Sequence, residues 1–232
     1  ISENMDYSSK NTVNPMLFLT EVLYLVGMWS KTDIPLYKNL IYRAYTTFVL
    51  ALIILQSCAS VMFCLKEPQL DLHDFIITIF IALGEGSCLT AAFSFIRGQD
   101  ALKKIFNILE EDFNEYPINM RLKWYRKGRI ICIFTVIIWP LWGFIYCVSP
   151  VIMSFSEEIS NGTSQKVNLP LNSWFPFDSN TSPTFEVLYF LQILAVLTGI
   201  VPASVFYAIF MTLSMFIIQQ FEFVNNSLRN MK

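Results

Sequence analysis

The residues that could do chemistry in this 232-residue chain are few, and they do not form a catalytic set. The single histidine, His73, lies between Asp71 and Asp74, and no further ligand has the spacing that a metal site or an acid–base pair requires. The sequence also has no glycine-rich phosphate loop and no C-x-x-C pair. We therefore predict that the chain is not an enzyme and holds no cofactor or metal, and that His73 and its neighbours are polar groups at a membrane interface.

Glu85 is an acidic residue in the middle of an apolar stretch. It is flanked by Gly84 and Gly86, with Ser87 and Thr90 one turn further on. A carboxylate at that depth is costly and usually faces a cavity or a partner. Two interpretations stay open: a wet cavity or gating contact, or a structural hydrogen bond, with the acid protonated, between helices that the small residues bring close together.

The apolar segments around these residues predict a membrane protein. Hydrophobic residues make up 54% of the chain and charged residues 15%, whereas about 25% are charged in an ordinary soluble domain. A helix needs about 20 apolar residues to cross ~30 Å of hydrocarbon. Four stretches are long enough: residues 44–65, 75–96, 130–153 and 187–218. The predicted fold class is an all-α polytopic membrane protein with four transmembrane helices.

A shorter apolar stretch, Pro15 to Trp29, precedes these segments. At helical rise it covers roughly 22 Å, which is too short to cross, so it predicts a re-entrant or interfacial helix. Residues 1–14 are polar, and we expect no secretory signal there. The predicted parts are a cytoplasmic N-terminus with the short helix (1–39), a transmembrane bundle (40–218) and the start of a cytoplasmic helical assembly region (219–232).

The basic residues predict how the chain is oriented in the membrane. Short cytoplasmic loops carry an excess of lysine and arginine. Of the 16 basic residues only Lys66 and Lys166 fall on one side of the predicted spans, and the others fall on the opposite side. The N-terminus is therefore predicted to be cytoplasmic. The net charge of −2 suggests no nucleic-acid partner.

This orientation places the loop Ser154 to Glu186 outside the cell. The loop holds two glycosylation sequons, at Asn161 and Asn180, on the side where glycans are added. A third sequon, at Asn225, falls on the cytoplasmic side and is expected to stay bare. A cytoplasmic N-terminus is also opposite to the topology of a G-protein-coupled receptor.

Two segments carry a resemblance to a known family. One is LYLVGMW, Leu23 to Trp29, and the other is LPLNSWFPFDSNTSPTFEVLYFLQ, Leu169 to Gln192. Together with the cytoplasmic N-terminus, the elements of the second segment resemble the insect odorant receptor family, and within it the variable ligand-tuning subunits rather than the co-receptor. Those elements are Leu169-Pro170, the run from Trp174 to Asp178, Ser182-Pro183, and Tyr189 to Gln192.

The resemblance implies a ligand-gated, non-selective cation channel in the plasma membrane of a sensory neuron dendrite. Members of the family have seven spans and assemble as tetramers, usually with the co-receptor, around a pore lined by the seventh helix. Only four spans are present here, so the chain looks like the N-terminal portion of such a subunit. Two alternatives stay open: a gustatory-receptor-like channel subunit, and a fragment of a secondary transporter. In a transporter, the helices would be broken near the substrate site by Pro140, Pro150 and Pro202.

The family's odorant pocket lies in the outer half of the membrane, and the resemblance therefore implies a ligand site at that depth here. Helical spacing selects one face from the outer half of each of the last three spans. These faces are mostly apolar with a few hydroxyl, indole and amide groups, which suits a small hydrophobic volatile ligand. The predicted ligand-binding residues are Ile76, Ile79, Phe80, Thr135, Ile138, Trp142, Tyr189, Gln192 and Val196.

The cytoplasmic end of the fourth span predicts an assembly surface. Residues 187–218 would be roughly 48 Å long as a helix, more than the ~30 Å hydrocarbon core requires. The continuation keeps an apolar stripe on one helix face, formed by Phe221, Val224, Leu228 and Met231. A matching stripe in the basic loop between the second and third spans is formed by Leu102, Ile105, Leu109 and Phe113. In the resembling family this region carries most subunit contacts, so we expect assembly there.

Overall fold

The computed structural model describes residues 15–30, 35–66, 71–114, 116, 118–161, 168–179 and 181–230. These residues form five helices, and no strand occurs among them: α2 (Pro15–Leu25), α3 (Leu36–Lys66), α4 (Leu72–Asn114), α5 (Ile118–Asn161) and α6 (Thr184–Asn230). The helices α3 to α6 each contain a segment that is long and apolar enough to cross a membrane. The chain is thus an all-α, multi-pass membrane protein, as its composition predicts.

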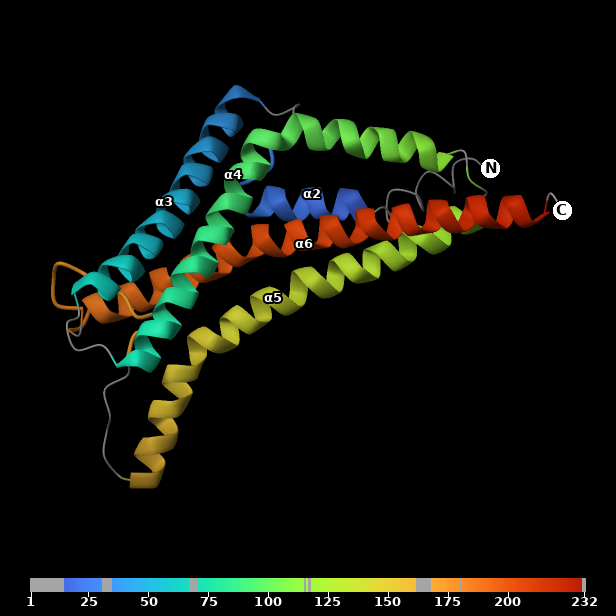
Figure 1. Ribbon diagram of the computed structural model, residues 1–232. Coiled ribbons are helices and arrows are strands. Elements are labelled where there is room, and N and C mark those ends of the chain that lie inside the picture. Colours follow the sequence, from blue (N-terminus) through green and yellow to red (C-terminus); the bar gives the residue numbers. More distant parts are fainter. Residues whose placement is uncertain are drawn as a thin grey trace.

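Each long helix extends well past its apolar segment. The 47 residues of α6 correspond to roughly 70 Å of helix, about twice the hydrocarbon thickness. In Figure 1, α5 and α6 run side by side toward the C-terminus, and the last part of α4, drawn in bright green, turns to lie over α2. Leu102 and Leu109 of that part pack against the buried core, whereas Ile105 is exposed.

The short helix α2 is buried against α5 and α6. Its buried side chains are Pro15, Met16, Leu19 and Leu23. The helix ends before the apolar stretch does, because Gly27 takes a positive φ of 83°. The amide of Gly27 donates to the Tyr24 carbonyl at 3.1 Å and that of Met28 to the Leu23 carbonyl at 2.9 Å, which is a Schellman motif.

Two polar side chains hold the segment that follows α2. The hydroxyl of Tyr42 in α3 accepts from the Trp29 amide at 3.1 Å and donates to the Trp29 carbonyl at 2.8 Å. From α4, the Gln99 side-chain amide donates to the Met28 carbonyl at 2.9 Å and accepts from the Ser30 amide at 3.4 Å. The chain leaving α2 is therefore attached to α3 and α4 by its own backbone groups.

The central helix is α6, which packs against α2, α3, α4 and α5. It packs closely against α5 at Gly143, where a Cβ would lie 2.4 Å from the Ile200 Cδ1 and 3.2 Å from the Val196 Cγ1. Further along the same pair of helices, Trp139 stacks on Tyr207 with their ring centroids 5.8 Å apart. The missing side chain of Gly143 thus leaves the space that Ile200 and Val196 occupy at this point of the α5–α6 contact.

The far end of α5 separates from the other helices. In Figure 1 the last part of α5, drawn in yellow, bends away from both α4 and α6. The helix contains Pro140 and Pro150, each of which removes one backbone donor and crowds the preceding turn, so a bend in this region has a local cause.

Candidate functional site

The loop between α5 and α6, called the external loop after the side of the membrane that the sequence predicts for it, is anchored to α6 by one buried glutamine. Gln192 is only 2% exposed. Its side-chain amide donates to the Ser173 hydroxyl at 3.0 Å and to the Leu171 carbonyl at 3.3 Å, and its amide oxygen accepts from the Leu171 backbone amide, also at 3.3 Å. All of these partners lie in the loop segment that precedes α6, so the helix fixes the path of the loop that leads into it.

The same loop is attached to α3. The Gln56 side-chain amide donates to the Ser173 hydroxyl at 2.8 Å and to the Ser60 hydroxyl at 3.3 Å. In addition, the Trp174 backbone amide donates to the Ala59 carbonyl at 3.0 Å, and the Lys66 ammonium lies 5.6 Å from the centroid of the Trp174 ring. Ser173 therefore receives hydrogen bonds from two helices at once.

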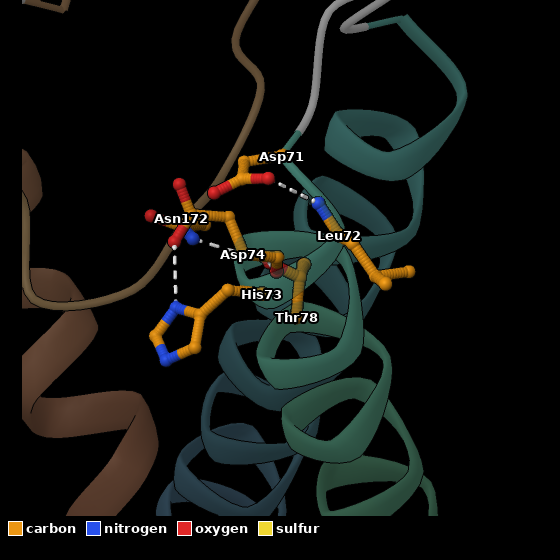
Figure 2. A network of polar contacts seen from close by, with 6 residues as sticks. All are labelled: Asp71, Leu72, His73, Asp74, Thr78 and Asn172. Carbon is orange, nitrogen blue, oxygen red and sulfur yellow. Dashed lines mark hydrogen bonds and ion pairs between the residues drawn. The ribbon is translucent and has the colours of Figure 1, made fainter.

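The third attachment of the loop is to α4, and Figure 2 shows it. The Asn172 side-chain amide donates to the Thr78 hydroxyl at 3.1 Å, and Thr78 is buried. Asp71 accepts from the Leu72 amide at 2.8 Å at the start of α4. The loop thus covers one end of the bundle by joining three different helices.

The structure places His73 beside one aspartate at the start of α4. Its Nδ1 lies 3.5 Å from the Asp74 carboxylate, and both side chains are exposed (Figure 2). No group of histidine, cysteine and acidic side chains with metal-binding geometry occurs among the described residues.

Four of the six predicted ligand residues on α4 and α5 are exposed on the described helices. Ile76, Ile79 and Phe80 on α4 are all exposed, Phe80 to 78%. On α5, Thr135 and Ile138 are partly buried and Trp142 is 68% exposed. The helices α4 and α5 both pack against α6.

The three predicted ligand residues on α6 each contact another part of the bundle. The Tyr189 hydroxyl donates to the Cys147 carbonyl of α5 at 2.5 Å. Gln192 bonds the external loop, and Val196 lies against Gly143. A cavity of about 150 Å³ lies elsewhere, between α2, α4, α5 and α6, next to Met16 and Tyr125. The nine-residue ligand site therefore stays a prediction.

Glu85 faces α3. Both carboxylate oxygens are buried and make no hydrogen bond of ordinary geometry with any described residue. The polar side chains beside them are Ser60, Gln56 and Ser57. We did not single out Gln56 from the sequence, although it is the one amide in the apolar segment 44–65 and that isolation is a usable signal.

The predicted assembly and glycosylation residues are placed only in part. Phe221, Val224 and Leu228 of α6 are all more than half exposed, while Met231 and the side chain of Phe113 lie outside the described residues. Asn161 is the last residue of α5, and Asn180 lies outside the described residues. The assembly and glycan sites stay predictions.

Comparison with known proteins identifies the fold. No protein-family model and no curated protein sequence matches the chain. Two solved structures match it: the insect olfactory receptor OR5 from Machilis hrabei in complex with eugenol, with a TM-score of 0.68, and the same receptor described without a ligand, with a TM-score of 0.67. Both are 18% identical to this chain, and each match covers 92% of this chain and 55% of the receptor. The chain, which spans about half the length of that receptor, therefore has the fold of an insect olfactory receptor over the helices that the two share.

Proposed function

We propose that this chain belongs to an odorant-binding subunit of a ligand-gated, non-selective cation channel. The observation that carries the proposal is the likeness to the insect olfactory receptor OR5 over 92% of the chain. That receptor was solved with eugenol, a small organic compound. The resemblance of the external loop, from Leu169 to Gln192, points to the same family independently of the structure.

The proposed ligand is a small hydrophobic volatile molecule bound in the outer half of the membrane. The predicted lining is apolar apart from Thr135, Trp142, Tyr189 and Gln192. Burial of apolar surface would supply most of the affinity, and the few polar groups would orient the ligand. Trp142 and the α4 residues are exposed in the described helices, so further helices of the subunit would have to close the site.

The proposed partner is a co-receptor subunit in a heterotetramer, with the N-terminus in the cytoplasm. The exposed apolar stripe of Phe221, Val224 and Leu228 supports a protein contact at the end of α6, because a helix face of this kind is usually covered in an assembly. The charge distribution around the spans supports the orientation.

Concentration–response curves of the full receptor, expressed with a co-receptor, test the ligand site. Trp142→Ala and Tyr189→Phe are expected to change the rank order of active odorants while surface expression stays near that of the unmodified receptor. Phe210→Ala is the matched control, because Phe210 is also an exposed aromatic side chain of a spanning helix but is not in the predicted site. An unchanged rank order in both site variants would remove the two residues from the ligand site.

A further inference from the structure

Glu85 in α4 is the one described carboxylate whose two oxygens are both buried without a hydrogen-bond partner. Ser60, Gln56 and Ser57 on the facing helix α3 come within interaction range of the carboxylate, but none of them meets the geometry of a hydrogen bond to it. An ionised carboxylate can only accept hydrogen bonds, and in a low-dielectric interior it needs donors or a cation to offset its lost hydration. The state of this side chain can therefore be argued from which donors its neighbours still have free.

Most of the neighbouring donors are already engaged. The Ser57 hydroxyl donates to the Ile53 carbonyl at 3.0 Å. The Gln56 amide has two hydrogens, of which one points to Ser60 at 3.3 Å and the other to Ser173 at 2.8 Å. Among these three side chains only the Ser60 hydroxyl keeps a free donor, while free lone pairs remain on the Ser57 hydroxyl and on the Gln56 amide oxygen. The site around Glu85 is thus rich in acceptors and poor in donors.

The other charged groups are too few to change this balance. The titratable side chain that faces Glu85 is Cys88, one turn further along α4. The side chains that α3 presents to Glu85 are all uncharged, and residues 187–218 of α6 include no charged side chain. An added proton would turn Glu85 from an acceptor into a donor, which is what the surrounding oxygens lack.

We propose that Glu85 is protonated in the packed bundle and acts as a positioning residue that donates its O–H to Ser57 and so leaves Gln56 free to hold the external loop through Ser173. If Glu85 loses its proton, the carboxylate competes for the Gln56 amide, and the Gln56–Ser173 hydrogen bond is weakened. The proton on Glu85 then controls how firmly the loop is attached to α3. This inference does not depend on the identity of any ligand.

Infrared spectroscopy of the purified full-length protein in lipid bilayers tests the protonation directly. At neutral pH, carboxyl groups exposed to water are ionised. The carbonyl band of a protonated carboxyl group therefore comes from a group that is shielded from water. The expected result is a band in the unmodified protein that is lost in Glu85→Gln, whose side chain has a similar shape. If the unmodified protein and Glu85→Gln show the same carbonyl bands in this region, the proposal is overturned.

Two further measurements test the acceptor and the link to the loop. Ser57→Ala is expected to keep the band and shift it to higher frequency, because the acid loses its acceptor; an unshifted band would overturn that assignment. Raising the pH until the band disappears should speed hydrogen exchange in residues 171–174 of the unmodified protein by more than the rise of the intrinsic exchange rate with pH. Glu85→Gln should show only that intrinsic rise. Equal acceleration in both proteins would contradict the link between Glu85 and the loop.

Discussion

The side-chain amide of Gln192 in α6 donates a hydrogen bond to the hydroxyl of Ser173 in the external loop, with 3.0 Å between the two atoms. The same hydroxyl accepts from Gln56 of α3 at 2.8 Å. A hydroxyl has two acceptor lone pairs, so both are engaged. One serine thus joins the loop to two helices at the end of the bundle.

Replacing that serine should destabilise the protein. Ser173→Ala leaves two amide donors without their acceptor, and each buried unpaired donor costs about 1–3 kcal/mol. We expect a lower melting temperature of the purified protein and reduced surface expression. Ser179→Ala, in the same loop, is the matched control and should be close to neutral. Equal melting temperatures for the two variants would show that the Ser173 contacts add nothing to stability.

A single methyl group at the α5–α6 contact should have a comparable effect. Gly143→Ala places a Cβ 2.4 Å from the Ile200 Cδ1 and 3.2 Å from the Val196 Cγ1, so the Ile200 side chain must change rotamer and Val196 must give way slightly. Overpacking of this kind costs about 1–3 kcal/mol. The control is Gly84→Ala, because no atom lies within 4 Å of its Cβ position, and a helix generally gains stability from that exchange. Thermal unfolding should rank Gly143→Ala well below Gly84→Ala, and the reverse order would disprove the close approach.

The predicted orientation can be checked with a protease site. A cleavage sequence inserted within residues 160–166 should be cut by a protease added outside intact cells, since this loop is predicted to be external. The same sequence inserted within residues 110–116 should be protected until the cells are permeabilised. The opposite pattern would place the N-terminus outside and reverse the topology.

The exposed stripe on α6 should carry subunit contacts. Substituting Val224→Asp and Leu228→Asp together puts two charges on an apolar surface, and we expect tetramers to be lost on gel filtration while the protein still enters the membrane. Asn225→Asp adds a charge in the same turn at a position that is already polar and exposed, and it is the control. Tetramers that survive the double substitution would exclude this stripe as the assembly surface.

Much of the fold was predictable because apolar length alone identifies a spanning helix. The stretches 44–65, 75–96, 130–153 and 187–218 lie inside α3, α4, α5 and α6. The composition did not fix where those helices end, since helix continues through the polar residues past each span. The end of α2 was also missed, because it depends on the positive φ of Gly27 and on the hydrogen bonds that this conformation allows.

The site was less predictable, for a physical reason. Gln192 was selected for a ligand because of its helical position, yet its amide bonds the external loop. The partner of a buried polar side chain depends on the path of a loop, which local periodicity does not contain. Gln56 and Ser173 meet across 117 residues of sequence, and only the folded chain brings them together.

Whole-cell current recording tests the central claim most directly. Cells that express the full-length receptor with a co-receptor should show an inward cation current while certain compounds from a panel of volatile molecules are applied. Cells with the co-receptor alone should not respond to those compounds. The current should persist when G-protein signalling is blocked, because the receptor itself would form the channel. Two results would contradict an odorant-gated channel. One is that no volatile compound evokes a current although the receptor is correctly folded and at the cell surface, and the other is that the current vanishes when G-protein signalling is blocked.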